Sequence, residues 1–166
     1  MLRYRYVGWL EYGELAEALA SKVTMGGERF DLVVGIARGG IPIAMVVSDR
    51  IGARIDLINV KSYSGIAQRA APRILTTLTE KIAGRAVLLV DDLVDQGDTM
   101  VFLKSYLAKQ KPKVLRTAVL FKKPWSKTEP DYFLEELKEW VVFPFEVGEV
   151  ERLRAQPKES LGKRKK

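Results

Sequence analysis

Two adjacent carboxylates, Asp91 and Asp92, are the residues of this chain best placed to do chemistry. They follow an apolar run, residues 86–90, which is long enough for one buried strand, and they stand where that strand is expected to end. A short turn, residues 95–99, comes next and leads into an expected helix over residues 100–111. The order is therefore a strand, an acidic tip, a turn that contains glycine, and a helix.

This order suits the binding of a phosphorylated ligand. In an open parallel sheet, ligands bind at the carboxyl ends of the strands, and a helix N-terminus offers backbone N–H groups and a positive dipole to a phosphate. Gly97 allows the backbone to approach a ligand closely, and Thr99 adds a hydroxyl donor. Two other interpretations fit the same residues. Asp95 or Asp98 could only cap the helix, and phospho-acceptor receiver domains also have a strand that ends in two aspartates.

The composition restricts the chemistry further. The sequence contains neither cysteine nor histidine, which excludes disulfides, thiolate nucleophiles, imidazole bases and histidine-bound metals. Proton transfer must then use a carboxylate, a lysine, a tyrosine or water. A metal would have to be a hard ion that is bound by oxygen, such as Mg²⁺.

Length and hydropathy indicate a single globular domain. The 166 residues are 47% hydrophobic and 30% charged, and they suffice for one domain with a sizeable core. No apolar run is long enough to cross a membrane, and the first residues lack the apolar segment of a signal peptide. We therefore expect a cytoplasmic protein that does not contact a membrane.

The positive charge is concentrated at the C-terminus. The net charge is +7, and residues 152–166 carry +6 of it, which leaves +1 for residues 1–151. We expect residues 151–166 to form a disordered, solvated basic tail outside the domain, which spans residues 1–150. Such a tail could bind nucleic acid weakly, but no nucleic-acid partner is expected because the body is nearly neutral.

The first half of the chain predicts one strand–helix–strand unit. Residues 11–23 have apolar side chains at helical spacing, and residues 30–37 are a β-branched run that predicts a buried strand. That run continues directly into a glycine-rich turn, residues 38–40. A helix over residues 41–51 and a strand over residues 54–60 complete the unit.

The second half continues the alternation after one interruption. We interpret residues 61–78 as a mobile hairpin or lid, and the alternative is an ordinary β-hairpin at the edge of the sheet. Residues 86–90 and 113–121 supply the third and fourth strands. Alternating units of this kind predict an α/β fold with a doubly wound, mostly parallel sheet. Its core covers residues 11–121, and the N-terminal residues and residues 122–148 form a small C-terminal hood.

Two of the predicted loops resemble loops of the type I phosphoribosyltransferase family. Residues 87–99 are similar to its signature for phosphoribosyl pyrophosphate (PRPP), except that Gln96 stands where the family has Ser or Thr. Residues 36–40 are similar to its pyrophosphate loop. Residues 121–124 and 140–145 look like the base-binding segments of the xanthine–guanine phosphoribosyltransferases within that family.

The resemblance implies a binding mode for PRPP. Backbone N–H groups of residues 95–99 and the Thr99 hydroxyl would bind the ribose 5-phosphate. Asp91 and Asp92 would face the ribose hydroxyls and a Mg²⁺ ion. Arg38 and the glycines after it would hold the pyrophosphate, and the family suggests a cis peptide bond before Arg38. The PRPP-binding set implied in this way is Ala37, Arg38, Gly39, Gly40, Lys61, Asp91, Asp92, Asp95, Gln96, Gly97, Asp98 and Thr99.

The resemblance also implies a purine site. Asp95 would lie near N7 of the base and act as the general base or acid. Lys123 would contact the oxygen at position six of the purine. Trp140 would stack on the ring, and the backbone of Val141 would read its edge. As alternatives, Lys123 could be a solvated surface lysine, and Trp140 could belong to the core.

The activity implied by the resemblance is purine salvage. Such an enzyme joins guanine, xanthine or hypoxanthine to PRPP with the help of Mg²⁺, and it releases pyrophosphate and the nucleoside 5′-monophosphate. We expect it to be a homodimer or tetramer. The alternative is a regulatory protein of the same fold that senses PRPP or a nucleotide, although the sequence shows no helix-turn-helix module.

Overall fold

The computed structural model describes residues 3–65 and 68–155, and these residues form two compact units. The sheet unit is Leu15–Lys138, and the terminal unit contains residues 3–14 and 139–155. Helix α1 (Trp9–Met25) begins in the terminal unit and continues into the sheet unit. Each unit is described separately below.

The sheet unit contains a six-stranded sheet with the order β4-β3-β2-β5-β6-β7. Its strands are β2 (Leu32–Ala37), β3 (Arg54–Gly65), β4 (Gln68–Thr76), β5 (Ala86–Val94), β6 (Val114–Lys122) and β7 (Tyr132–Glu136). Neighbouring strands pair in parallel, except that β3 and β4 pair antiparallel. The predicted α/β class with a mostly parallel sheet is therefore confirmed.

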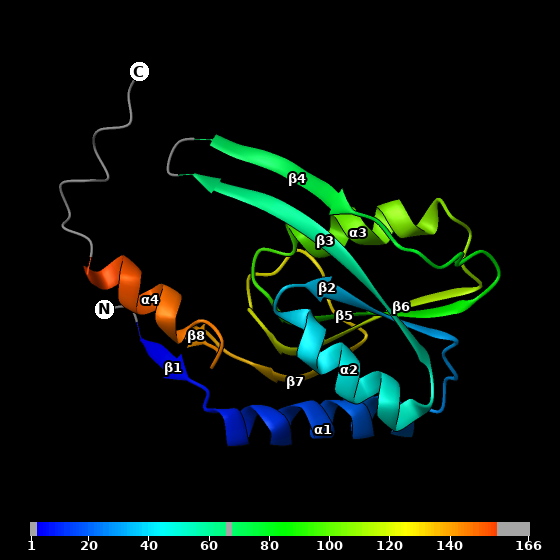
Figure 1. Ribbon diagram of the computed structural model, residues 1–166, viewed down its shortest axis with the longest axis horizontal. Coiled ribbons are helices and arrows are strands. Elements are labelled where there is room, and N and C mark those ends of the chain that lie inside the picture. The colour runs from blue at the N-terminus through cyan, green and yellow to red at the C-terminus, as the bar shows by residue number, and fades with distance from the viewer. Residues whose placement is uncertain (1–2, 66–67, 156–166) are drawn as a thin grey trace. The chain divides into compact units, whose positions relative to one another are not determined.

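Two helices cover opposite faces of this sheet, as Figure 1 shows for α2 (Gly40–Ile51) and α3 (Asp98–Ala108). On one face, a side chain at Gly35 of β2 would come within 2.9 Å of the Ala44 methyl group of α2. On the other face, Leu32 of the same strand packs in a buried cluster with apolar residues of α3. Because successive strand residues alternate between faces, this packing makes the sheet doubly wound, as predicted.

Strand β5 is longer than the sequence predicts. Its buried part covers residues 86–90 as expected, but the parallel pairing with β6 continues until Val94 lies opposite Lys122. Asp91 and Asp92 therefore lie within the strand and not beyond its end, because the hydrogen-bonded pairing with β6 continues past the apolar run. Helix α3 correspondingly starts at Asp98, two residues before the predicted start.

The segment predicted as a mobile hairpin or lid forms an antiparallel hairpin at the edge of the sheet. Strand β3 continues to Gly65, so Lys61 lies within a strand and not after it. Lys61 pairs with Arg73 of β4. Residues 66 and 67 lie outside the described residues, and movement of the hairpin as a lid stays a prediction.

The terminal unit is built on a two-stranded parallel sheet of β1 (Tyr4–Tyr6) and β8 (Trp140–Val142). The ring of Tyr12 packs edge to face against Phe143 and Phe145, with centroid distances of 5.9 and 5.6 Å. Tyr12 and Phe143 are buried and belong to the core of the unit, whereas Phe145 is exposed. Residues 132–136, which the sequence assigned to the hood, instead form the outer strand of the large sheet.

The C-terminal part of the terminal unit is helical. Helix α4 covers Val147–Ala155, so the first residues of the predicted disordered tail are in a helix. Residues 156–166 lie outside the described residues. Across the parts of the chain that the structure describes, no helix combines the length and the apolar character needed to span a membrane.

Candidate active site

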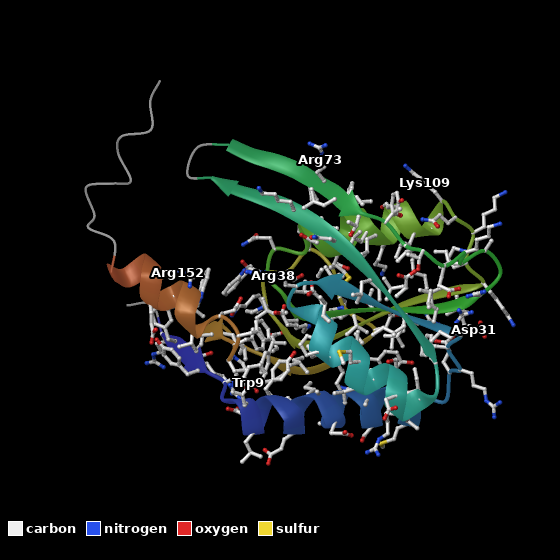
Figure 2. The ribbon with its side chains drawn as sticks, viewed as in Figure 1. Trp9, Asp31, Arg38, Arg73, Lys109 and Arg152 are labelled. Carbon is white, nitrogen blue, oxygen red and sulfur yellow. The ribbon has the colours of Figure 1, made fainter. Side chains whose placement is uncertain are left out.

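The glycine-rich turn and the acidic pair lie side by side at the carboxyl edge of the sheet. Strands β2 and β5 are neighbours, and Gly35, close to the end of β2, pairs with Val90, which directly precedes Asp91 on β5. Figure 2 shows Arg38 at the carboxyl end of β2, where the chain passes into α2, whereas Asp31 lies at the other end of this strand. The peptide bond between Ala37 and Arg38 is cis, as the family resemblance suggests. Parallel pairing thus brings together two loops that are far apart in the sequence.

The two glycines of this turn are in direct contact with β5. A Cβ atom at Gly39 would overlap the carboxylate of Asp92. A Cβ atom at Gly40 would overlap the carbonyl oxygen of Val90 and lie 3.0 Å from the Cα atom of Asp91. Only glycine fits at these positions without a shift, and the proposed pyrophosphate loop and the acidic pair therefore form one site.

The acidic pair is electrostatically unfavourable in the protein alone. Burial and, second, the negative charge of Asp92 raise the pKa of Asp91 well above its ordinary value. The backbone N–H of Asp92 donates a 3.0 Å hydrogen bond to Asp91 Oδ1, which partly offsets these effects. Two neighbouring carboxylates of this kind favour the approach of a cation.

Replacing Asp91 with asparagine is expected to stabilise the protein in metal-free buffer. The pKa of Asp91 is higher in the folded protein than the value of about 3.9 of an unfolded aspartate. The folded state therefore binds this proton more tightly, and stability decreases as the pH rises from about 4 through the raised pKa. Asp91→Asn removes that decrease, so its free energy of unfolding exceeds that of the wild type most clearly at neutral pH.

Urea unfolding with EDTA at several pH values between about 4 and 8 measures this difference. The expected result is that the two proteins have similar stabilities at the acidic end and that the variant gains as the pH rises. Parallel stability curves for the two proteins would contradict the electrostatic account of Asp91.

The turn before α3 contains a glycine with a left-handed backbone. Gly97 has a φ of +86° and is the N-cap of the helix, where no side chain forms a capping hydrogen bond. The alternative that Asp95 or Asp98 only caps the helix is therefore wrong for this structure. A turn before a helix N-terminus can offer backbone N–H groups to an anion, and the role of residues 95–99 toward a phosphate stays a prediction.

A second loop holds this turn in place. We call residues 123–128 the clasp, because they contact Val94 at the end of β5 and the turn that follows it. The backbone N–H of Lys123 donates to the carbonyl oxygen of Val94 at 2.9 Å, and the N–H of Lys127 donates to that of Gln96 at 3.0 Å. A Cβ atom at Gly97 would lie 2.9 Å from Ser126 Oγ, so the clasp packs directly on the turn.

Side chains of the clasp also bind the two acidic residues of the turn. The indole Nε1–H of Trp125 donates a 2.8 Å hydrogen bond to Asp95 Oδ1. The ammonium group of Lys127 donates to Asp98 Oδ1 at 2.5 Å. Sequence reasoning missed Trp125 and Lys127, although both follow the strand next to β5 and thus lie at the same edge of the sheet.

The two neighbouring lysines at the start of the clasp differ in their surroundings. Lys123 is only 5% exposed, so the alternative of a solvated surface lysine is wrong. Its ammonium group lies 5.8 Å from the ring centroid of Trp125. Lys122, in contrast, points to the carboxylates of Glu129 and Glu136, which lie 2.6 and 3.1 Å from its Nζ atom. Its pKa is raised, first by the hydrogen bond to Glu129.

The remaining predicted residues are Trp140, Val141 and Lys61. Trp140 is 53% exposed on β8, so it does not belong to the core, and Val141 beside it is buried. Both belong to the terminal unit, and their role toward a base stays a prediction. Lys61 is exposed on β3 of the sheet unit, and its role toward pyrophosphate is equally a prediction.

The two carboxylates of the acidic pair fit a magnesium ion whose other ligands come from a bound phosphorylated ligand. Among residues 3–65 and 68–155 there is no group of three or more acidic side chains that could hold a metal alone. Mg²⁺ in phosphate-binding sites is usually held by one or two carboxylates together with substrate oxygens. Asp91 and Asp92 supply two carboxylates whose mutual repulsion a cation would relieve.

Comparisons with known proteins agree with this geometry. A family model described as the phosphoribosyl transferase domain matches residues 8–152. The xanthine-guanine phosphoribosyltransferases of Idiomarina loihiensis and Cereibacter sphaeroides are each 30% identical to this chain over 145 and 150 residues, which is 86% of the chain and 86% and 87% of the relatives.

A solved structure has a similar fold over most of the chain. The purine phosphoribosyltransferase from Pyrococcus horikoshii has a TM-score of 0.78 and 30% sequence identity to this chain. The alignment covers 87% of this chain and 95% of that one.

Proposed function

Because the chain belongs to the phosphoribosyltransferase family, we propose that it transfers the phosphoribosyl group of PRPP to a 6-oxopurine. The base is guanine, xanthine or hypoxanthine, and the products are the nucleoside 5′-monophosphate and pyrophosphate. The observation that carries the proposal is the close approach of Gly39 to Asp92. It joins an anion-binding turn to an acidic pair, which is what a sugar with a pyrophosphate leaving group requires. The names of the relatives support a purine as the acceptor.

The sheet unit anchors both ends of PRPP in this proposal. Nitrogen N9 of the purine forms a bond to the anomeric carbon C1′, and the bond from C1′ to the pyrophosphate oxygen breaks. The N–H groups of residues 95–99 bind the 5-phosphate, and the Thr99 hydroxyl adds a donor. Arg38 and the backbone of Gly39 bind the pyrophosphate and stabilise the charge that it gains as it leaves.

Asp91 and Asp92 act on the sugar. As C1′ loses its leaving group, the ribose ring becomes electron-poor, and nearby carboxylates stabilise that charge. The same carboxylates bind the ribose hydroxyls and fix the ring. A bound Mg²⁺ ion would neutralise charge on the pyrophosphate and thereby make it a better leaving group.

Asp95 and Lys123 act on the base. The base must lose one proton when N9 bonds to C1′, and Asp95 accepts it from N7. Lys123 donates a hydrogen bond to the oxygen at position six, which adenine lacks. We further propose that Trp140 stacks on the purine, that the Val141 backbone reads its edge, that Lys61 contacts pyrophosphate, and that the protein is a cytoplasmic homodimer or tetramer.

Replacing Lys123 with methionine is expected to raise the KM for the base by about ten- to a hundredfold, because a hydrogen bond from a charged donor contributes about 1.5–3 kcal/mol. Methionine has a similar length and suits a buried position. The Kd for PRPP should change little. Steady-state kinetics at saturating PRPP measure the effect.

Lys122→Met is the matched control for this variant. It removes the ion pairs to Glu129 and Glu136 but no proposed base contact. Its KM for the base should match that of the wild type. Equal KM values for the wild type and Lys123→Met would contradict the assignment of Lys123.

A base panel tests the proposed function. Purified protein, Mg²⁺ and PRPP are mixed with guanine, xanthine, hypoxanthine, adenine, uracil or orotate in turn, and pyrophosphate release is followed. Release with the three 6-oxopurines alone is expected. Release with adenine or a pyrimidine would contradict the role of Lys123. Binding of PRPP without release for any base would instead favour a regulatory protein.

A further inference from the structure

We infer that Trp125 is a positioning residue for the catalytic carboxylate Asp95. The indole Nε1–H of Trp125 donates a 2.8 Å hydrogen bond to Asp95 Oδ1. A hydrogen bond to one carboxylate oxygen fixes the rotation of the group and leaves the other oxygen, Oδ2, to accept the proton of the base. This inference rests on the proposed function and deepens it.

The surroundings of Trp125 do not suggest that it serves the core. Its side chain is 46% exposed, although tryptophan stabilises a protein mainly when its large ring is buried. Its indole N–H donates a hydrogen bond inside the protein, and the acceptor is the carboxylate of Asp95, the proposed general base. Pro124 precedes it and restricts the backbone of the clasp, which limits the positions that the ring can take.

The clasp holds Trp125 against the turn from both sides. Before Trp125 in the sequence, the N–H of Lys123 donates a hydrogen bond to the carbonyl oxygen of Val94. After it, the N–H of Lys127 donates a hydrogen bond to the carbonyl oxygen of Gln96. Trp125 lies between these two backbone anchors. The backbone on both sides of Trp125 is therefore anchored to the segment that carries Asp95.

The same ring also lies near the second proposed contact to the base. The ammonium group of Lys123 is 5.8 Å from the centroid of the Trp125 ring, within the range of a cation–π interaction. Asp95 and Lys123, which would meet N7 and the oxygen at position six, thus both contact one indole. Trp125 fixes the spacing between the two groups that recognise this edge of the purine.

Two substitutions at position 125 separate the N–H group from the ring. Trp125→Phe keeps an aromatic ring but lacks the donor. Replacement of Trp125 by β-(3-benzothienyl)alanine keeps the size of the indole and has sulfur in place of N–H. Both variants should lower kcat about tenfold and leave the Kd for PRPP within about twofold, since one hydrogen bond to a charged group is lost. Recovery of kcat by the isosteric variant would overturn the inference, because packing alone would then suffice.

A double-mutant cycle tests whether Trp125 acts through Asp95. In the Asp95→Asn background, Trp125→Phe should cause little further loss of kcat. A full additional loss would overturn the inference.

Lys127→Met is the control, because it breaks another side-chain hydrogen bond of the clasp to the turn, the one to Asp98. It should raise the Kd for PRPP and leave kcat nearly unchanged. If Trp125→Phe also raised the Kd for PRPP and left kcat nearly unchanged, Trp125 would have a structural role only, and the inference would be overturned.

A measurement without turnover completes the test. In a ¹H–¹⁵N NMR spectrum, the indole N–H signal of Trp125 is assigned by its loss in Trp125→Phe among the three tryptophans. This signal should shift in Asp95→Asn, and an unchanged signal would overturn the inference.

If the wild-type protein shows no turnover with any base, the proposed function fails and the inference fails with it. If it turns over and Trp125→Phe does so equally well, only the inference fails.

Discussion

Asp95→Asn is expected to lower kcat about 10³-fold while PRPP still binds, because a positioned general base contributes about 10²- to 10⁴-fold. Asp95 is exposed at the carboxyl edge of the sheet, and the indole of Trp125 holds one of its oxygens. Asparagine has nearly the same shape but cannot accept a proton from N7. Single-turnover kinetics with guanine and a separate titration with PRPP measure the two effects.

The binding half of this prediction has a definite sign. PRPP is a multiply charged anion, and the loss of a negative charge beside it cannot weaken its electrostatic attraction. A PRPP affinity that falls as much as kcat would therefore show that Asp95 only shapes the turn. Asp98→Asn is the comparison within the same turn. It breaks the ion pair to Lys127 and should affect the Kd for PRPP more than kcat.

Gly39→Ala should lower kcat/KM for PRPP about a hundredfold without unfolding the protein, because a small misplacement of a binding group can cost about 10²-fold. Gly39 has φ and ψ angles of −62° and −35°, which alanine adopts easily. The penalty is therefore steric and arises from the carboxylate of Asp92, which the new methyl group would displace. One methyl group thus disturbs both the pyrophosphate loop and the acidic pair.

Gly13→Ala is the matched control for this variant. Gly13 lies inside α1, and an added Cβ atom would have no neighbour within 4 Å. Alanine in a helix interior stabilises the protein by about 0.5–1 kcal/mol relative to glycine, and the activity should stay unchanged. Thermal unfolding and kcat/KM are measured for both variants. Wild-type kinetics in Gly39→Ala would contradict the assignment of the pyrophosphate loop.

The sequence was most informative where local pattern and burial agree. The apolar run at residues 86–90 and the helix over residues 41–51 follow directly from hydrophobic periodicity. Gly39 touches the carboxylate of Asp92 and Gly97 has a positive φ, and neither feature follows from the sequence pattern, which marked the two glycines only as expected ligand contacts. The two loops at the edge of the sheet were nevertheless predictable from alternating strands and helices.

The sequence was less informative where distant segments decide the structure. Strand β5 continues past its apolar run because β6 pairs with it as far as Lys122, and no local signal reports that ladder. Lys123 is buried because the clasp folds onto the turn before α3. The hydrogen bond between Trp125 and Asp95 joins residues that are 30 positions apart, so spacing alone could not predict it.

Product analysis with guanine tests the central claim most directly. The protein is incubated with Mg²⁺ and PRPP, with and without guanine, and the nucleotide and pyrophosphate are quantified by chromatography. We expect equal amounts of guanosine 5′-monophosphate and pyrophosphate when guanine is present and almost no pyrophosphate without it. Pyrophosphate release that is independent of the base, or PRPP binding without any nucleotide formed from guanine, xanthine or hypoxanthine, would contradict phosphoribosyl transfer to a 6-oxopurine.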